Sequence, residues 1–281
     1  MKVLVTGAKG QLGYDVCKRL EELGISYVGI DRDECDLTDD SQVQQVFTSL
    51  SPTAVIHCAA YTAVDKAETE LKACQEINVD ATINVSVYCK QYDVPMLYIS
   101  TDYVFSGKGD LPFQVGSAYE PQNVYGRTKA EGELVVKQLL RKHFIVRISW
   151  VFGKNGKNFV DTMRKLGSEK NELTVVADQI GSPTYTCDLA VLLVDMIRTD
   201  KYGVYHATNE GFCSWAEFAN EIMKISGLNC SIKPVTSDKY PTAAVRPLNS
   251  RLSKASLDQS GFKRLPHWND ALRRYIESSD R

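Results

Sequence analysis

Three glycines near the start of the chain constrain its fold more than any other sequence feature. Gly7, Gly10 and Gly13 follow an apolar strand expected at Lys2–Thr6 and open an amphipathic helix expected at Gln11–Leu23. Glycines are needed where backbone N–H groups at a helix N-terminus meet a pyrophosphate, because side chains would block the approach. The pattern predicts a dinucleotide-binding turn, and a tight strand-to-helix turn without a ligand is the alternative.

Strand-like and helix-like segments alternate through the first 150 residues of the chain. Further strands are expected at Tyr27–Ile30, Ala54–His57, Met96–Ser100 and Phe144–Ser149. The helices expected between them span about residues 41–50, with Ser41 as N-cap, 66–92 and 123–142. This alternation predicts an α/β fold with a Rossmann-type parallel sheet and helices on both faces.

The pattern loosens after Trp150, and we expect a second, smaller unit there. We assign residues 1–150 to the dinucleotide-binding domain and residues 151–281 to a C-terminal substrate-binding lobe. Segments between about 172 and 207 should rejoin the sheet through a strand at Leu173–Ala177 and a helix at Asp188–Ile197. Lobe helices are expected at Trp215–Ser226 and Trp268–Ser278.

Composition argues against several classes of protein. The net charge of −2, without a basic stripe, gives no case for binding nucleic acid. No stretch approaches the roughly 20 apolar residues of a membrane span, and the first residues do not resemble a signal peptide. The eight cysteines form no CxxC pair, so we expect reduced thiols, a cytoplasmic protein and no metal site.

Tyr125 and Lys129 form a YxxxK pair whose side chains share one face of the expected helix. A free tyrosine has a pKa of about 10, and a neighbouring ammonium group should lower that pKa. Such a tyrosine can give a proton to a carbonyl oxygen while hydride arrives at the carbonyl carbon. The lysine can also hold the ribose of a nicotinamide coenzyme.

The position of a third residue separates this pair from a chance match. Thr101 ends the fourth expected strand, and ligands of open α/β sheets lie at the carboxyl ends of strands. Tyr14 and Lys18 repeat the YxxxK spacing beside the glycine turn, but no polar strand end accompanies them. We therefore predict a catalytic set of Thr101, Tyr125 and Lys129; a capped strand end beside a surface helix is the alternative.

Two residues at the end of the second expected strand argue in opposite directions about the coenzyme. Asp31 can accept hydrogen bonds from the adenosine ribose, which favours NADH. Arg32 can pair with a 2′-phosphate, which favours NADPH. The sequence therefore predicts NADPH or NADH without choosing between them.

With these residues the chain resembles the extended short-chain dehydrogenases/reductases, whose glycine spacing is also GxxGxxG. More narrowly, it is similar to the dTDP-4-dehydrorhamnose reductase family over nearly its whole length. The segments that carry the resemblance are Gly7–Gly13, Cys58–Glu68, Ser100–Phe105, Asn123–Lys129, Ser149–Gly153, Asp178–Thr184 and Arg246–Leu252. Several long segments in one order are more specific than any single motif.

The resemblance implies a set of coenzyme contacts. Gly10, Gln11 and Leu12 would hold the pyrophosphate, with Gly7 and Gly13 completing the turn. Asp31 would meet the adenosine ribose, and Asp36 and Leu37 would lie by the adenine. Ala60, Tyr61 and Thr62 would line the nicotinamide side, although many relatives carry histidine where this chain has Tyr61.

The resemblance also implies contacts to a sugar nucleotide. Thr101, Asp102 and Trp150 would touch the substrate, since an indole face packs well on a sugar or a base. Arg246 would pair with the substrate pyrophosphate, although a structural salt bridge is equally compatible with the sequence. Some relatives dimerise around a divalent metal; we identify no such ligand set here, and a homodimer without metal stays open.

The implied reaction is NAD(P)H-dependent reduction of the C4 keto group of dTDP-4-dehydro-β-L-rhamnose to dTDP-L-rhamnose, a step of nucleotide-sugar and cell-surface polysaccharide synthesis. Dehydratases of this fold follow the threonine with Asp-Glu, whereas here Asp102 is followed by Tyr103. An epimerase with tightly held NAD is one alternative. A non-catalytic NADP-binding subunit, resembling the regulatory subunit of methionine adenosyltransferase, is another.

Overall fold

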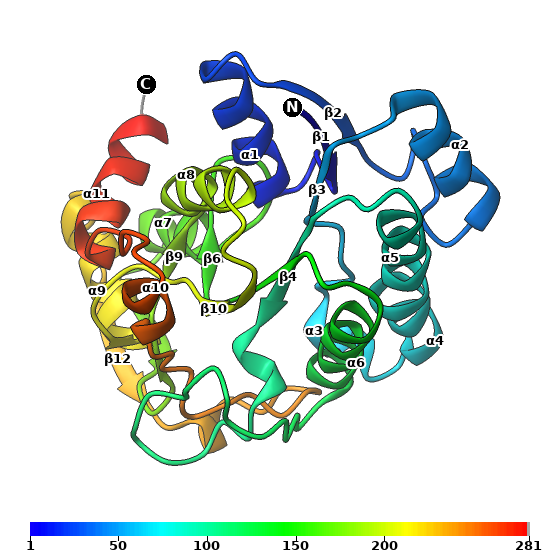
Figure 1. Ribbon diagram of the computed structural model, residues 1–281. Coiled ribbons are helices and arrows are strands. Elements are labelled where there is room, and N and C mark those ends of the chain that lie inside the picture. The colour runs from blue at the N-terminus through cyan, green and yellow to red at the C-terminus, as the bar shows by residue number, and fades with distance from the viewer. Residues whose placement is uncertain (280–281) are drawn as a thin grey trace.

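A six-stranded parallel sheet forms the centre of the computed structural model, which describes residues 1–279 (Figure 1). Its strands run in the order β10-β5-β4-β3-β1-β2. Their bounds are β1 Lys2–Thr6, β2 Ser26–Ile30, β3 Ala54–His57, β4 Met96–Thr101, β5 His143–Ile148 and β10 Gly203–His206. The predicted α/β fold with a Rossmann-type parallel sheet is confirmed.

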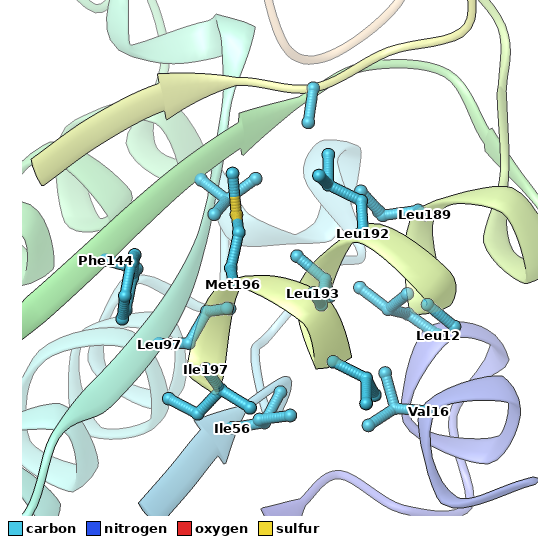
Figure 2. Packing of buried hydrophobic residues seen from close by; sticks show 14 of the residues in the cluster. Leu12, Val16, Ile56, Leu97, Phe144, Leu189, Leu192, Leu193, Met196 and Ile197 are labelled. Carbon is cyan, nitrogen blue, oxygen red and sulfur yellow. The ribbon is translucent and has the colours of Figure 1, made fainter. Parts of the chain in front are cut away.

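Helices cover both faces of this sheet (Figure 1). On one face lie α1 Gln11–Glu22 and α8 Thr186–Ile197; on the other lie α2 Asp40–Leu50, α5 Ala81–Gln91 and α6 Val124–Leu139. Alternate strand residues point to opposite faces: Val3 and Val5 pack beneath α1 and α8, whereas Leu4 belongs to the core on the other face. Figure 2 shows side chains of the core between the sheet and the helices α1 and α8. Those labelled are Leu12, Val16, Ile56, Leu97, Phe144, Leu189, Leu192, Leu193, Met196 and Ile197.

The strand order places a switch point beside β1. The chain leaves β1 through α1 to β2 on one side, and then crosses to β3 on the other side of β1. Connections diverge there, which leaves a crevice at the carboxyl ends of the strands. The glycine turn, at the carboxyl end of β1, lies at this crevice.

A separate apolar core organises much of the C-terminal half. Three helices surround it: α7 Phe159–Glu169, α9 Trp215–Ile225 and α11 Trp268–Ser279. Short strands complete this region in pairs: β6 Val151–Phe152 with β9 Thr184–Tyr185, β7 Glu172–Val176 with β12 Ser231–Val235, and β8 Ile180–Gly181 with β11 Cys213–Ser214. The helix α10 Ala255–Gln259 follows them along the chain.

The strand expected at Leu173–Ala177 does not return to the main sheet. It forms as β7 but pairs with β12, and it is β10 that extends the main sheet beside β5. Burial explains the difference, because only Leu173 and Val175 of β7 are buried, while the residues before each of them are exposed. A strand buried on one face suits an outer two-stranded sheet better than a sheet covered on both faces. The boundary between two domains near residue 150 stays a prediction.

The long helix expected at about 66–92 is interrupted. The chain forms α3 Val64–Ala67, α4 Leu71–Gln75, a π-helical turn η1 Glu76–Asp80 and then α5. Periodicity could not reveal the break, since the apolar spacing continues through it. The N-cap of α2 is also Asp39 rather than Ser41, because the Asp39 carboxylate accepts from the amides of Ser41 and Gln42.

The eight cysteines are free thiols. Within the described part of the chain, no three His, Cys, Asp or Glu side chains gather closely enough to hold a metal ion. No helix among residues 1–279 combines the length and the apolar character that crossing a bilayer requires.

Candidate active site

A cavity of about 890 Å³ opens at the carboxyl ends of the central strands. It brings together parts of the chain that are far apart in sequence: the glycine turn, the ends of β2, β4 and β5, the loop after β3 and the first turns of α6. Fifteen of the seventeen residues predicted for the site line it, namely Gly7, Gly10, Gln11, Leu12, Gly13, Asp31, Asp36, Leu37, Ala60, Thr62, Thr101, Asp102, Tyr125, Lys129 and Trp150. Tyr61 and Arg246 are not among its lining residues.

The glycine turn is packed so tightly that side chains do not fit. Gly7 has φ +67°, and a Cβ there would lie 2.7 Å from the backbone nitrogen of Ala59. A Cβ on Gly13 would overlap the carbonyl oxygen of Gly7. Gly10 is the N-cap of α1 and offers no side chain to the first-turn N–H groups of that helix. The turn is therefore a cradle made of backbone, which fits a pyrophosphate.

Acidic side chains at the end of β2 are held by local hydrogen bonds. The Asp31 carboxylate accepts from the amides of Lys9, at 3.0 Å, and Arg32, at 2.9 Å. The amide and hydroxyl of Thr38 donate to Asp36 at 3.0 and 2.7 Å, and the hydroxyl bond is the main reason that the pKa of Asp36 is lowered. Hydrogen bonds within the protein therefore hold the carboxylates of Asp31 and Asp36 in place without a ligand.

A buried asparagine ties the loop after β3 to α6. Asn78, on the π-helical turn, accepts from the amide of Tyr61 at 2.8 Å and donates to the hydroxyl of Thr128 at 2.9 Å. The Tyr61 phenol instead donates to Glu70 at 2.5 Å, so this side chain is directed away from the cavity that Ala60 lines. Sequence analysis missed Asn78, although an amide on an otherwise amphipathic helix was a signal. π-Helical turns often mark functional sites, because they re-aim side chains.

The three residues predicted to be catalytic converge on the cavity from two elements. Thr101 ends β4, while Tyr125 and Lys129 share one face of α6. Asn123 caps that helix, with its side chain accepting from the amide of Gly126 at 2.7 Å, and this fixes the first turn that carries Tyr125. The geometry is that of a proton donor with a lysine one helical turn away.

Burial controls the charges of this set. It is the main reason that the pKa of Tyr125 is raised, with the Asp102 charge adding to the shift and Thr101 opposing it. The net shift is therefore opposite in direction to the one expected from the neighbouring lysine, because burial dominates it. Burial also lowers the pKa of Lys129 to about 7, and its ammonium nitrogen lies 4.0 Å from the centre of the Tyr98 ring. Tyr125 is protonated at neutral pH, as a proton donor must be.

Asp102 is a buried carboxyl of the cavity wall whose hydrogen bonding is incomplete. Its side chain is only 3 % exposed, and burial raises its pKa to about 6. Thr101 donates to its Oδ1 at 3.0 Å, and the nearby Ser250 hydroxyl opposes the rise in pKa, but Oδ2 has no partner at full hydrogen-bond geometry among residues 1–279. Buried carboxylate oxygens are normally paired, so this oxygen marks Asp102 as a candidate for a role in ligand binding.

A buried ion pair holds α6 against the sheet behind the cavity. Arg147 of β5 donates to both carboxylate oxygens of Glu133, at 2.8 and 2.7 Å. Ser100, next to Thr101, donates to the same carboxylate at 2.5 Å. Glu133 is one helical turn beyond Lys129, so the pair fixes the helix and the strand end that carry the catalytic set. Sequence analysis missed this pair.

Arg246 lies in an ion pair outside the cavity lining. Its guanidinium donates to Asp65 at 2.6 Å and to the phenol of Tyr103 at 3.2 Å. The structure therefore has the salt bridge that the sequence left open, and a contact of Arg246 with a pyrophosphate stays a prediction. Tyr103 in turn packs edge-on against Tyr125, with ring centres 5.5 Å apart.

A family model described as the RmlD substrate binding domain matches residues 1–281. The chain belongs to this family. It is 40 % identical over 276 residues to the spore coat polysaccharide biosynthesis protein SpsK of Bacillus subtilis, covering 98 % of this chain and 97 % of that protein. It is 36 % identical over 285 residues to the dTDP-4-dehydrorhamnose reductase of Aggregatibacter actinomycetemcomitans, covering 97 % of each.

A solved structure agrees with these relatives. The dTDP-4-dehydrorhamnose reductase of Bacillus anthracis, in complex with NADP, superposes with a TM-score of 0.96 at 42 % identity, covering 99 % of each chain. The resemblance predicted from the sequence is confirmed, and the chain is an NAD(P)H-dependent enzyme of this reductase family. The relatives carry different names, so these names do not determine which sugar nucleotide this enzyme reduces.

Proposed function

We propose that this enzyme reduces the C4 keto group of dTDP-4-dehydro-β-L-rhamnose with NAD(P)H, giving dTDP-L-rhamnose. The observation that carries the proposal is the convergence of Thr101, Tyr125 and Lys129 in one cavity with the glycine turn. The names of the Aggregatibacter actinomycetemcomitans and Bacillus anthracis relatives support this choice of sugar. The cavity of about 890 Å³ is also large enough for a coenzyme and a sugar together.

The residues of the glycine turn fit a dinucleotide, because Gly7 and Gly13 let the turn pack closely on the backbone of its neighbours, so that backbone N–H groups at the start of α1 face the cavity without side chains. In the proposed complex, Gly10, Gln11 and Leu12 hold the pyrophosphate at the N-terminus of α1. Ala60, Thr62 and Lys129 border the nicotinamide riboside. The reduced coenzyme, when bound, supplies hydride to the carbonyl carbon of the substrate.

Tyr125 acts as the proton donor in this proposal. Its phenol is protonated at neutral pH because burial raises its pKa, and it gives that proton to the C4 oxygen as the carbonyl is reduced. Thr101 supplies a second hydroxyl for the same oxygen. The phenolate left on Tyr125 regains a proton through Lys129, whose pKa of about 7 suits proton exchange at neutral pH.

Asp102 and Trp150 form the proposed substrate wall. The unpartnered Oδ2 of Asp102 accepts a hydrogen bond from a sugar hydroxyl, which removes the cost of burying that oxygen alone. The Trp150 indole packs against an apolar face of the sugar nucleotide. The product would enter cell-surface polysaccharide synthesis in the cytoplasm.

Either NADPH or NADH can serve in this proposal. Asp31 and Arg32 both line the cavity, so a ribose hydroxyl and a 2′-phosphate each have a partner there. The Bacillus anthracis relative was solved with NADP, which favours NADPH. We expect turnover with both coenzymes and the higher kcat/KM with NADPH.

A coupled assay tests the proposal. The 4-keto-L-sugar nucleotide is generated in place, each reduced coenzyme is added separately, and the loss of absorbance at the nicotinamide band is followed. We expect stoichiometric oxidation of coenzyme and formation of dTDP-L-rhamnose. Purified protein that carries one tightly bound NAD, and changes the sugar without net coenzyme oxidation, would be an epimerase instead. Coenzyme binding without turnover of any keto-sugar nucleotide would indicate a binding subunit.

A further inference from the structure

Trp150 has a backbone conformation that tryptophan rarely adopts. Its φ is +50°, in the left-handed region, and it lines the cavity directly after β5. Hydrogen bonds fix the backbone on both sides of it: the Trp150 carbonyl accepts from the amide of Thr184 at 3.0 Å, and the hydroxyl of Thr184 donates to the carbonyl of Ser149 at 2.6 Å. Strain of this kind persists where surrounding structure holds it, and it is frequent at functional sites.

A second indole lies flat against the first. The ring centres of Trp150 and Trp215 are 3.7 Å apart, with an angle of 13° between the ring planes. Among residues 1–279, Trp150 lines the cavity and Trp215 does not, so Trp215 contacts the wall residue without belonging to the wall. Phe159 packs against Trp215 in turn, with ring centres 4.6 Å apart. Two further aromatic rings, Trp215 and Phe159, thus lie behind Trp150.

Local structure explains why Trp215 reaches this position. It begins α9 directly after β11, whose residue Cys213 pairs with Gly181 of β8. Ser214 caps the helix through a reciprocal pair of bonds with Glu217, which fixes the direction in which α9 starts. The same two-residue strand pairing therefore places both Trp215 and Gly181 around the Trp150 indole.

Gly181 also lies close to the Trp150 ring. A Cβ on Gly181 would lie 2.8 Å from Cε2 of Trp150 and 3.0 Å from Cβ of Ser250. The Trp150 side chain is held between a stacked indole and a close backbone, and it cannot swing away without moving one of them. An unpaired tryptophan would instead lose rotamer freedom each time a ligand bound.

We propose that Trp215 is a positioning residue that holds the Trp150 indole as a rigid, preformed wall for the sugar nucleotide. The proposal rests on the function proposed above, because it assigns the substrate rather than the coenzyme to this wall. Trp215 acts through Trp150 and does not touch the ligand. Its removal should raise the KM for the sugar nucleotide while leaving coenzyme binding unchanged.

The three tryptophans of the chain allow a direct spectroscopic test. Two stacked indoles give an exciton couplet in far-ultraviolet circular dichroism, and only Trp150 and Trp215 are stacked at 3.7 Å. Trp215→Leu and Trp150→Phe should each abolish the couplet. Trp268→Phe is the matched control, because Trp268 packs on the same Phe218 ring of the lobe core as Trp215 does, and it should leave the couplet intact.

Kinetics then separate positioning from folding. We expect Trp215→Leu to raise the KM for the keto-sugar nucleotide about tenfold, at an unchanged Kd for NADPH, and Trp215→Phe to restore most of the affinity because it keeps a ring in the stack. Trp268→Phe should change neither constant more than about twofold. A normal KM in Trp215→Leu, with the couplet lost, would overturn the proposal.

A binding measurement keeps the test independent of turnover and of the folding of any variant. Titration of the wild-type enzyme with dTDP-L-rhamnose, the product of the proposed reaction, should change the exciton couplet and saturate. Binding without any change in the couplet would contradict a wall at Trp150. A wild-type protein whose couplet responds to dTDP-L-rhamnose, but which reduces no keto-sugar nucleotide, would retain the wall and reject the proposed reaction.

Discussion

Two aspartates line the same cavity and differ in how the protein treats their charge. Asp36 lies near the surface, and hydrogen bonds from Thr38 lower its pKa. Asp102 is buried, its pKa is raised to about 6, and its Oδ2 has no partner among the described residues. The first carboxylate stabilises the protein at neutral pH, whereas the second destabilises it there.

The same difference separates the two walls to which these aspartates belong. The coenzyme wall, from the glycine turn to Asp36, is formed by backbone and by two carboxylates that accept hydrogen bonds: Asp31 from the Lys9 amide, and Asp36 from Thr38. The substrate wall, around Asp102 and Trp150, carries an unpartnered oxygen and a left-handed tryptophan, which costs about 1–2 kcal/mol. Backbone strain and a buried carboxylate oxygen without a partner therefore occur together where we propose that the sugar binds.

The largest effect should come from the catalytic set, which lies between the walls. Tyr125→Phe should reduce kcat at least about a hundredfold, because it removes the proton donor, with the Kd for coenzyme near normal. Steady-state kinetics and a coenzyme titration measure both. Tyr14→Phe is the control: Tyr14 has the same sequence spacing to a lysine but is 45 % exposed on α1, and its loss should leave kcat unchanged. Normal turnover of Tyr125→Phe would end the assignment.

Adding a side chain to the glycine turn of the coenzyme wall should weaken binding of the coenzyme. Gly13→Ala places a methyl group on the carbonyl oxygen of Gly7, and backbone there cannot yield, so the Kd for NADPH should rise about tenfold or more. Gly116→Ala is the matched control, since a Cβ at Gly116 meets nothing within 4 Å. Calorimetric titration of both variants checks the difference. Equal coenzyme affinity in the two would show that the turn does not hold the pyrophosphate.

A glycine-to-alanine substitution on the substrate wall should weaken binding of the sugar nucleotide and leave binding of the coenzyme unchanged. Gly181→Ala pushes on the Trp150 ring, which can shift a little, so we expect the KM for the sugar nucleotide to rise about fivefold at an unchanged Kd for NADPH. Initial-rate measurements at saturating coenzyme give this KM. The comparison between walls fails if Gly13→Ala and Gly181→Ala impair the same constant.

The smallest effect should be on stability, and its sign should depend on pH. Because folding raises the pKa of Asp102 from 3.8 to about 6, the folded protein holds this proton more tightly, and stability falls as the pH rises through that interval. Asp102→Asn removes the buried charge, so Tm should rise by a few degrees at pH 7.5 and hardly change at pH 4. Thermal melts at the two values measure this.

Asp36→Asn provides the opposite case. A carboxyl whose pKa is lowered by folding stabilises the protein above its unfolded pKa, and that contribution disappears as the pH falls. The Asn variant should therefore have a lower Tm than the parent at pH 7.5. Shifts of the same sign in both variants would contradict the contrast between the two aspartates.

Sequence analysis succeeded where the determinants are local. The glycine turn and the strand before it depend on residues within a few positions of each other, so spacing alone predicts them. Thr101 and Tyr125 were found for a related reason, since the carboxyl ends of parallel strands meet at one edge of the sheet.

The rest depends on contacts between distant residues. The stack of Trp150 on Trp215 exists because β8 pairs with β11, and no local pattern in either segment signals that pairing. The bond from Asn78 to Thr128 likewise joins residues 50 positions apart, which no local pattern predicts. Burial also set the pKa of Tyr125, whereas its spacing to lysine suggested the opposite direction.

Isotope transfer tests the central claim most directly, because it follows the hydride from the coenzyme to one carbon of the sugar. The wild-type enzyme is supplied with the 4-keto-L-sugar nucleotide and NADPH that carries deuterium at the transferable position, and the product is examined by NMR. Our account predicts one deuterium at C4 of dTDP-L-rhamnose for each coenzyme oxidised. Product without deuterium at C4, or a changed sugar with no coenzyme oxidised, would contradict it.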